Sequence, residues 1–312
     1  MELLHEAVTG FLRHCRYEKN LGSKTLKAYQ IDLKQFTRFI TERDTPTEIQ
    51  QIGKNEIRHF IEFKSGLKPK SLKRKLATLK AMFNFLEFED HIIINPFRKM
   101  RINIREPRTL PSVMSLKEIS AILKLAYREK KLHKTGSFGY FETLRNITVL
   151  ELLFATGCRV SEITGLCCSR IDLKTGNITI LGKGSKERLI QICGADTLQM
   201  LSEYDRLARG FAGRLRNWFL VNRLKKKLSD QSVRNTVKRF ARRAKINRRI
   251  TPHTFRHSFA TLLLERDVDI KYIQAMLGHS SIMTTQIYTH VNRAKQRKIL
   301  FAKHPRRGLV VE

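Results

Sequence analysis

The stretch that most constrains this chain is residues 251–290, where a helix start is combined with polar side chains suited to chemistry. Thr251 followed by Pro252 predicts that a helix begins here, because threonine caps helices and proline favours the first helical position. His253 and Arg256 are three residues apart and therefore share one face of that helix. Apolar residues at helical spacing on another face are expected in the core: Phe255, Phe259, Leu262 and Leu263. The helix thus holds an imidazole beside a guanidinium, a pair that can bind phosphate and move a proton.

More polar residues extend this pattern in both directions along the chain. His279 follows Leu277-Gly278, where glycine suits a helix end, and Tyr288 lies in the segment after it. Upstream, Arg159 stands in the sequence ATGCRVSEI and Lys183 in LGKGSKER. In their order and spacing these residues resemble the active-site pattern of the tyrosine recombinases, or phage integrase family, and in particular its bacterial Xer-like branch.

The resemblance covers nearly the whole chain and implies a fold and a reaction. The fold is mainly α with a small β-sheet: an amino-terminal helical DNA-clamp (SAM-like) domain precedes the tyrosine-recombinase catalytic domain. The reaction is site-specific DNA recombination, which cuts and rejoins duplex DNA through a covalent 3′-phosphotyrosine and a Holliday junction. The residues that the resemblance makes catalytic are Arg159, Lys183, His253, Arg256, His279 and Tyr288, with Glu162 in a supporting role.

Each residue type fits the step that the resemblance gives it. Two arginines can stabilise extra negative charge on phosphate oxygens, because a guanidinium stays charged and offers a planar fork. Lys183 would protonate the departing 5′-oxygen, although Lys186 is close enough in sequence to compete. The two histidines would bind non-bridging oxygens and help deprotonate the tyrosine, whose pKa is ordinarily near 10. Glu162 either orients these groups or is a helix-start carboxylate favoured by the dipole.

Other interpretations of these motifs have less support. His253 and His257 are four residues apart on a helix, but the glutamate of the H-E-x-x-H pattern and a nearby cysteine are lacking, so we expect no metal site. The GKGS sequence lacks the spacing of a nucleotide-binding loop, and we expect no cofactor. Two alternative functions remain: DNA relaxation like that of a type IB topoisomerase, and DNA binding by a non-catalytic recombinase relative.

Charge points to the same class of partner. The 312 residues include 61 Lys+Arg against 28 Asp+Glu, a net charge of +33, which favours double-stranded DNA as the partner. A membrane role is not expected, because the chain lacks an apolar run of about 18 residues and a signal peptide. The five cysteines are odd in number and form no C-x-x-C pattern, which indicates reduced thiols in a cytosolic protein. The resemblance implies a cytoplasmic protein that is associated with the bacterial nucleoid.

We expect two domains joined by a basic linker. Residues 1–95 predict a bundle of four helices, with Ser23 capping the second and Ser71 opening the fourth. Residues 96–114 are rich in proline and arginine and predict the linker. Residues 115–312 form the catalytic domain, which opens with a capping box at Ser115 and Glu118. Within it we expect a loop over 128–140, a helix ending at Gly157, a hairpin of strands 177–181 and 188–192, and a helical tail.

A run of lysine and arginine without acids, between residues 63 and 86, favours phosphate contact over a merely solvated helix face. The residues predicted to bind DNA are Lys64, Lys68, Lys70, Lys73, Arg74, Lys75, Arg101 and Arg105. The resemblance implies inverted-repeat core sites, a dimer on each site and a tetramer in the synapse, with a second recombinase or an accessory protein as a further partner. It leaves open whether the role is chromosome-dimer resolution or mobile-element integration and excision.

Overall fold

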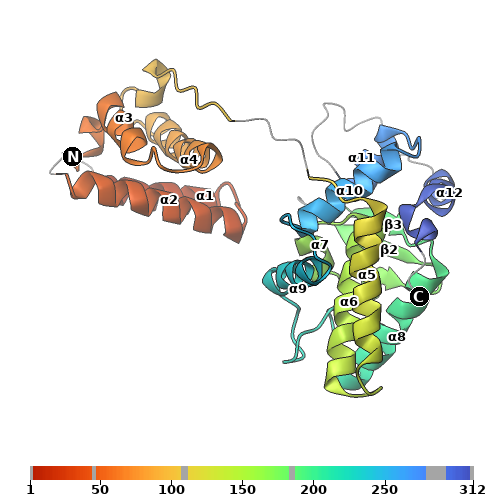
Figure 1. The fold of residues 1–312 in the computed structure, drawn as a ribbon. Coiled ribbons are helices and arrows are strands. Elements are labelled where there is room, and N and C mark those ends of the chain that lie inside the picture. Colours follow the sequence, from red (N-terminus) through yellow and green to blue (C-terminus); the bar gives the residue numbers. More distant parts are fainter. Residues whose placement is uncertain (1–2, 44–46, 107–111, 183–186, 279–292, 310–312) are drawn as a thin grey trace. The chain divides into compact units, whose positions relative to one another are not determined.

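The computed structural model describes the chain except residues 1–2, 44–46, 107–111, 183–186, 279–292 and 310–312. The chain divides into two compact units, unit 1 (Met1–Thr109) and unit 2 (Leu110–Glu312), each with its own hydrophobic core (Figure 1). The predicted fold class, mainly α with a small β-sheet, is confirmed. No helix in the described ranges is both long enough and apolar enough to cross a membrane.

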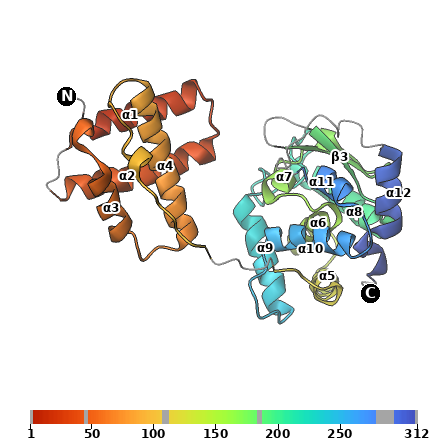
Figure 2. The same ribbon diagram turned by 90° about the horizontal axis from the view of Figure 1, so that it is seen from above.

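Unit 1 is a helical bundle (Figure 2). Its core is rich in phenylalanine. Its described elements are α1 (Leu4–Tyr17), α2 (Ser23–Thr41), α3 (Lys54–Phe63) and α4 (Pro69–Phe88), with two 3-10 turns, η1 (Ile49–Gln51) and η2 (Pro96–Lys99). Phe36 packs edge-on against Phe60 and Phe83, with ring centroids 5.1 and 6.4 Å apart. Phe97 packs against Phe83 at 6.0 Å and is buried. The segment predicted to be a linker therefore begins with a turn that belongs to the core of unit 1.

Two helix starts in unit 1 differ from the prediction. Gly22 is the N-cap of α2, and Ser23 is already its first helical residue, without a side-chain cap hydrogen bond. α4 begins at Pro69 rather than Ser71, with Lys68 as its N-cap. The fixed φ of proline suits a first helical position, and this preference extends the helix toward its amino end.

Unit 2 is built around one buried helix. Its described helices are α5 (Leu116–Lys131), α6 (Phe138–Thr156), α7 (Val160–Thr164), α8 (Ala195–Ala212), α9 (Asp230–Arg243), α10 (Pro252–Leu264), α11 (Ile270–Leu277) and α12 (Arg293–Lys303), with 3-10 turns η3 (Cys168–Arg170) and η5 (Pro305–Gly308). α6 lies in contact with α5, α7, α8, α9 and α10, and it is buried along almost its whole length (Figure 1). Apolar residues lie on all sides of this helix, which suits a central position, and its few buried charged groups are paired, as Glu151 is with Arg306 at 2.9 Å.

The loop predicted for residues 128–140 is shorter than expected. α5 continues through Lys131, and α6 already begins at Phe138. The hydroxyl of Ser137 caps α6 by accepting a hydrogen bond from the backbone N–H of Tyr140 at 3.2 Å. The predicted end of α6 is confirmed at Gly157, which has a left-handed φ of 60°.

A small antiparallel sheet lies in unit 2, with its strands in the order β1 (Ile171–Asp172), β2 (Asn177–Leu181) and β3 (Glu187–Gln191). β2 and β3 pair as the predicted hairpin, with Ile178 opposite Ile190 and Ile180 opposite Arg188. The three isoleucines are buried, so this face of the hairpin points into the core.

Candidate active site

α10 carries two of the predicted site residues, at different depths. The hydroxyl of Thr251 accepts a hydrogen bond from the backbone N–H of Thr254 at 3.2 Å, and Pro252 is the first helical residue, as predicted. Arg256 is buried, with 5% of its surface exposed, whereas His253 is exposed. The apolar face predicted for this helix, which includes Phe255 and Phe259, is buried as well.

The guanidinium of Arg256 is held by two backbone carbonyl groups. Nη1 donates to the Gly157 oxygen at 2.9 Å, and Nη2 donates to the Leu277 oxygen at 2.6 Å. Burial and the nearby positive charge of Arg159 lower the pKa of Arg256 to about 10. The side chain therefore stays charged at neutral pH, but in a setting that disfavours its charge until an anion arrives.

Arg159 stands at the start of α7, directly after the left-handed turn that ends α6. Its Nη1 donates to Glu162 Oε1 at 2.8 Å, and its backbone N–H donates to Glu162 Oε2 at 2.8 Å. Its Nη2 donates to the Gly278 oxygen at 3.1 Å. The side chain is partly exposed, so contacts with its own unit orient this guanidinium while it remains accessible.

Glu162 is shared between two arginines, one of which sequence reasoning missed. Arg188 of β3 donates from Nη2 to Glu162 Oε2 at 2.7 Å and from Nη1 to Oε1 at 3.1 Å. Burial of the Glu162 carboxyl group opposes its ionisation, but the hydrogen bonds from Arg188 and Arg159 hold its pKa below the usual value. The Glu162 carboxylate is therefore charged at neutral pH and joins α7 to the hairpin.

The carboxyl end of α11 joins the three arginines. The carbonyl groups of Met276, Leu277 and Gly278 accept hydrogen bonds from Arg188, Arg256 and Arg159, respectively. The last carbonyls of a helix have no intrahelical partners and carry partial negative charge, so guanidinium groups stabilise this end. Residues distant in sequence thus meet at one point of unit 2.

His253 of α10 has a lowered pKa, caused first by partial burial and then by the charges of His257 and Arg256. A neutral imidazole can accept a proton or a hydrogen bond, as its predicted role requires. The other predicted catalytic residues, Lys183, His279 and Tyr288, lie outside the described residues. By sequence, Lys183 belongs to the link between β2 and β3, and His279 directly follows Gly278.

Comparison with known proteins places the chain in a family. The family model for the phage integrase family matches residues 114–295, and the model for its amino-terminal SAM-like domain matches residues 8–90. A tyrosine recombinase of Agathobacter rectalis is 43% identical over 98% of this chain and 99% of its own length. The chain belongs to the phage integrase family of tyrosine recombinases. A second relative, tyrosine recombinase XerD of Listeria innocua, is 33% identical over 97% of this chain and 100% of its own.

Solved structures share the fold of this tyrosine recombinase. The XerH recombinase bound to its difH substrate has a TM-score of 0.67 at 22% identity, over 93% of this chain and 83% of that one. A lambda integrase dimer bound to a COC′ core site has a TM-score of 0.66 at 20% identity, over 90% of this chain and 96% of that one. At this identity the likeness concerns the fold.

In unit 1 of the recombinase, most residues predicted to bind DNA lie at the surface. The exposed ones are Lys68, Lys70, Lys73, Arg74, Arg101 and Arg105, and Lys64 is half-buried against the ring of Phe63. Lys75 is different: it is 5% exposed and donates to Asp32 at 2.8 Å and to Gln35 at 2.7 Å. A buried, paired ammonium group is not available to phosphate, so we remove Lys75 from the proposed DNA contacts.

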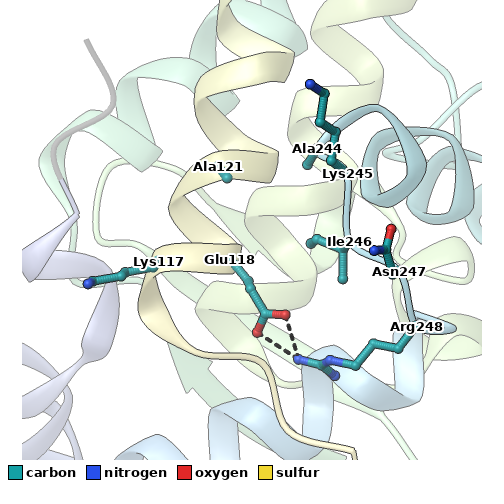
Figure 3. Close-up of a pocket in the computed structure, with 8 residues that line it drawn as sticks. All are labelled: Lys117, Glu118, Ala121, Ala244, Lys245, Ile246, Asn247 and Arg248. Atoms are coloured by element: carbon teal, nitrogen blue, oxygen red, sulfur yellow. Dashed lines mark hydrogen bonds and ion pairs between the residues drawn. The ribbon is translucent and has the colours of Figure 1, made fainter.

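A separate hollow of about 480 Å³ lies in unit 2 between α5 and the segment after α9 (Figure 3). Arg248 crosses it to pair with Glu118 at 2.6 Å, and also donates to the Val113 oxygen at 2.9 Å. The same Glu118 completes the predicted capping box by accepting from the Ser115 N–H at 2.8 Å. None of these residues belongs to the predicted site, and their contacts fasten the start of α5 to the rest of unit 2.

Proposed function

We propose that this recombinase exchanges DNA strands at specific sites by phosphoryl transfer to and from Tyr288. The tyrosine oxygen forms a bond to the scissile phosphorus, the bond to the 5′-oxygen breaks, and a 3′-phosphotyrosine results. A free 5′-hydroxyl of a partner strand then attacks this adduct and releases the tyrosine. The energy of the broken bond is retained in the adduct, so the reaction needs no external energy source.

The observation that carries this proposal is the pair of guanidinium groups held at the end of α11. Arg159 and Arg256 are each oriented by a backbone carbonyl of that helix end. A guanidinium has five N–H donors, and the contacts found among the described residues engage only part of them. The rest can donate to the non-bridging oxygens of a phosphate, where charge builds up in the transition state. Because the arginines are fixed beforehand, little reorganisation is needed at the moment of reaction.

The remaining roles follow from position and proton affinity. We assign to Lys183 the delivery of a proton to the 5′-oxygen, and to His253 and His279 the binding of phosphate oxygens and help in deprotonating Tyr288. The lowered pKa of His253 supports its part, because a neutral imidazole can take up a proton. Glu162 supports Arg159 through the hydrogen bonds described above.

The partner that we propose is duplex DNA with inverted-repeat core sites. Solved structures of lambda integrase contain a dimer on a core site and a tetramer on a Holliday junction. By analogy we propose two protomers for each core site, four in the synapse and a junction intermediate, with a second recombinase as a further partner. Unit 1 would clamp the duplex through the exposed lysines and arginines of α4 and the segment after η2, acting on DNA in the bacterial cytoplasm.

The proposal is tested with nicked suicide duplexes that carry inverted repeats found beside the gene. The wild type and Tyr288→Phe are incubated with each duplex in buffer that contains EDTA, and protein–DNA bands that survive SDS are measured. We expect an SDS-resistant, protease-sensitive band with the wild type alone. A band that persists with Tyr288→Phe would show that another residue is the nucleophile.

The same preparation separates the alternative functions. Relaxation of supercoiled plasmid without a paired site would favour a topoisomerase-like activity. Sequence-specific binding without an adduct on any duplex, alone or with a partner recombinase, would favour a non-catalytic DNA-binding protein. For the clamp, Lys68→Gln and Lys70→Gln should each reduce the slope of log K against log salt by about 1.

A further inference from the structure

Arg188 is a largely buried charge in a position where the pairing of strands predicts an apolar residue. It lies opposite Ile180, whose side chain is buried in the core of unit 2. Only 12% of the Arg188 side chain is exposed. A guanidinium at such a depth needs partners for its donors, since an unpaired buried charge is very costly. Its partners therefore show what the residue is for.

The first partner is the carboxylate that orients Arg159. Arg188 binds Glu162 through both Nη atoms, at 2.7 and 3.1 Å, in a bidentate arrangement. The same two carboxylate oxygens accept from the backbone and the guanidinium of Arg159. Because Arg188 fixes the plane of this carboxylate, it also fixes the direction in which Glu162 holds Arg159.

The second partner is the carboxyl end of α11. Arg188 Nε donates to the Met276 oxygen at 2.8 Å, next to the carbonyl groups that hold Arg256 and Arg159. The guanidinium also packs against Gly278, where an added Cβ would lie 3.1 Å from Nη1 of Arg188. Gly278 has a left-handed φ of 63°, which favours glycine a second time. The helix end and the arginine thus fit closely at the residue that precedes His279.

The third connection runs through the hairpin itself. Arg188 is the second residue of β3, the strand that follows the link containing Lys183. One side chain therefore joins the hairpin, the start of α7 and the end of α11. Each of these elements carries or adjoins a residue with a proposed role in the reaction.

We propose that Arg188 is a positioning residue of this recombinase, which sets Arg159 and the end of α11 for phosphoryl transfer without touching the phosphate. The inference rests on the proposed function, because it concerns the geometry of the same site. It distinguishes Arg188 from an arginine that only stabilises the fold: its loss should slow the chemical step while leaving DNA binding intact.

The test measures single-turnover cleavage of a suicide duplex at saturating protein, together with the Kd for the same duplex. Arg188→Gln removes the charge, and Arg188→Lys keeps it but loses the bidentate contact. We expect both to slow cleavage by about 10–100-fold, as for a displacement of a reacting group of the order of 1 Å, with Kd changed less than about threefold. Arg170→Gln is the matched control. Arg170 of η3 pairs with Glu187, the neighbour of Arg188 on β3, at 2.7 Å and in a more exposed position. This variant should cleave at the wild-type rate.

A double-mutant cycle decides whether Arg188 acts through Arg159. In an Arg159→Ala background, Arg188→Gln should slow cleavage by a smaller factor than in the wild-type background, because one of the two groups that Arg188 positions is already gone. Equal losses in both backgrounds would overturn the proposal, as would wild-type cleavage by Arg188→Lys and Arg188→Gln. If Arg188→Gln does not fold, Arg188→Lys carries the same cycle. Failure of the wild type to form any adduct would instead contradict the proposed function, so the two failures can be told apart.

Discussion

Gly157 is the position where a single methyl group should disturb the site most directly. Its φ of 60° lies in the left-handed region, and an added Cβ would lie 2.6 Å from Cδ1 of Phe259 and 2.8 Å from Cδ2 of Leu277. Both neighbours are fully buried core residues, so neither can move without repacking. Gly157→Ala therefore combines backbone strain with overpacking.

The loss of stability in Gly157→Ala is best measured by comparison with an alanine variant of a second glycine. Gly136 also has a left-handed φ, of 84°, but an added Cβ would have no atom within 4 Å. Backbone strain, about 1–2 kcal/mol, and the gain from a less flexible unfolded chain, about 0.4–1 kcal/mol, are shared by both alanine variants. The difference between them is the overpacking alone, about 1–3 kcal/mol. We expect Gly157→Ala to be less stable than Gly136→Ala by that amount.

The assay follows Trp218, which is the only tryptophan of the chain and lies in unit 2. Its fluorescence therefore reports the unfolding of unit 2 without a contribution from unit 1. For a unit of this size, about 2–4 °C per kcal/mol places the Tm of Gly157→Ala roughly 2–12 °C below that of Gly136→Ala. Equal Tm values for the two variants would refute the argument that contact with Phe259 and Leu277 fixes this glycine.

Three further predictions concern buried polar groups. Ser258→Ala removes the acceptor of the Met114 N–H, which donates to Ser258 Oγ at 2.7 Å. It should lower the free energy of unfolding of unit 2, followed by tryptophan fluorescence, by about 1–3 kcal/mol. An unchanged stability would mean that water replaces the hydroxyl. Burial lowers the pKa of His304 to about 4 from 6.5, so the unfolded state takes up the proton first, and unit 2 should lose about 3 kcal/mol as pH falls from 6.5 to 4. His304→Gln should flatten that pH dependence, and an unchanged curve would assign the loss to other groups. Asp32→Ala removes the carboxylate partner of the buried Lys75, which keeps only its hydrogen bond to Gln35, and should cost about 3–5 kcal/mol of stability, measured by calorimetry, whereas Asp32→Leu with Lys75→Met should cost less.

Local signals in the sequence predicted much of the fold. The capping box at Ser115 and Glu118, the cap at Thr251 and the glycine end at Gly157 involve residues that lie within one turn of each other. Such signals fail where two local preferences compete. Serine at position 23 suits a cap, but Gly22 takes that position, and a proline draws the start of α4 toward the amino end.

Lys75 shows that composition does not reveal pairing between residues that are distant in sequence. The run of lysines and arginines between residues 63 and 86 contains no acidic residue, so composition alone gives no reason to separate one lysine from another. The acid that pairs with Lys75 is Asp32, on another helix of the bundle. Lys75 follows Leu72 and precedes Leu76 and Leu79, and this helical spacing already places it beside the apolar stripe. The run of lysines and arginines correctly predicted an exposed basic surface on α4. The helical spacing of the apolar residues would have excluded Lys75 from that surface.

Arg188 was missed for a similar reason, although a signal existed. The strand alternation places it on the same face as Ile190, and its partner across the hairpin is Ile180. An arginine on a core-facing strand position calls for a carboxylate partner, and the sequence alone does not show that Glu162 is that partner. The two requirements meet only when α7 and β3 are brought together in three dimensions.

The charges at the end of α11 explain why the site combines three arginines with the Glu162 carboxylate and a helix end. Three guanidinium groups at the end of α11 repel one another, and the pKa of Arg256 is lowered first by burial and then by the charges of Arg159 and Arg188. Glu162 offsets one charge, and three carbonyl groups of the helix end offset part of the rest. The site therefore keeps an excess of positive potential, held in place by groups that cannot move away. A phosphate that gains negative charge in its transition state relieves this repulsion more than the ground state does, so the cost of assembling the arginines becomes selective stabilisation of the reaction.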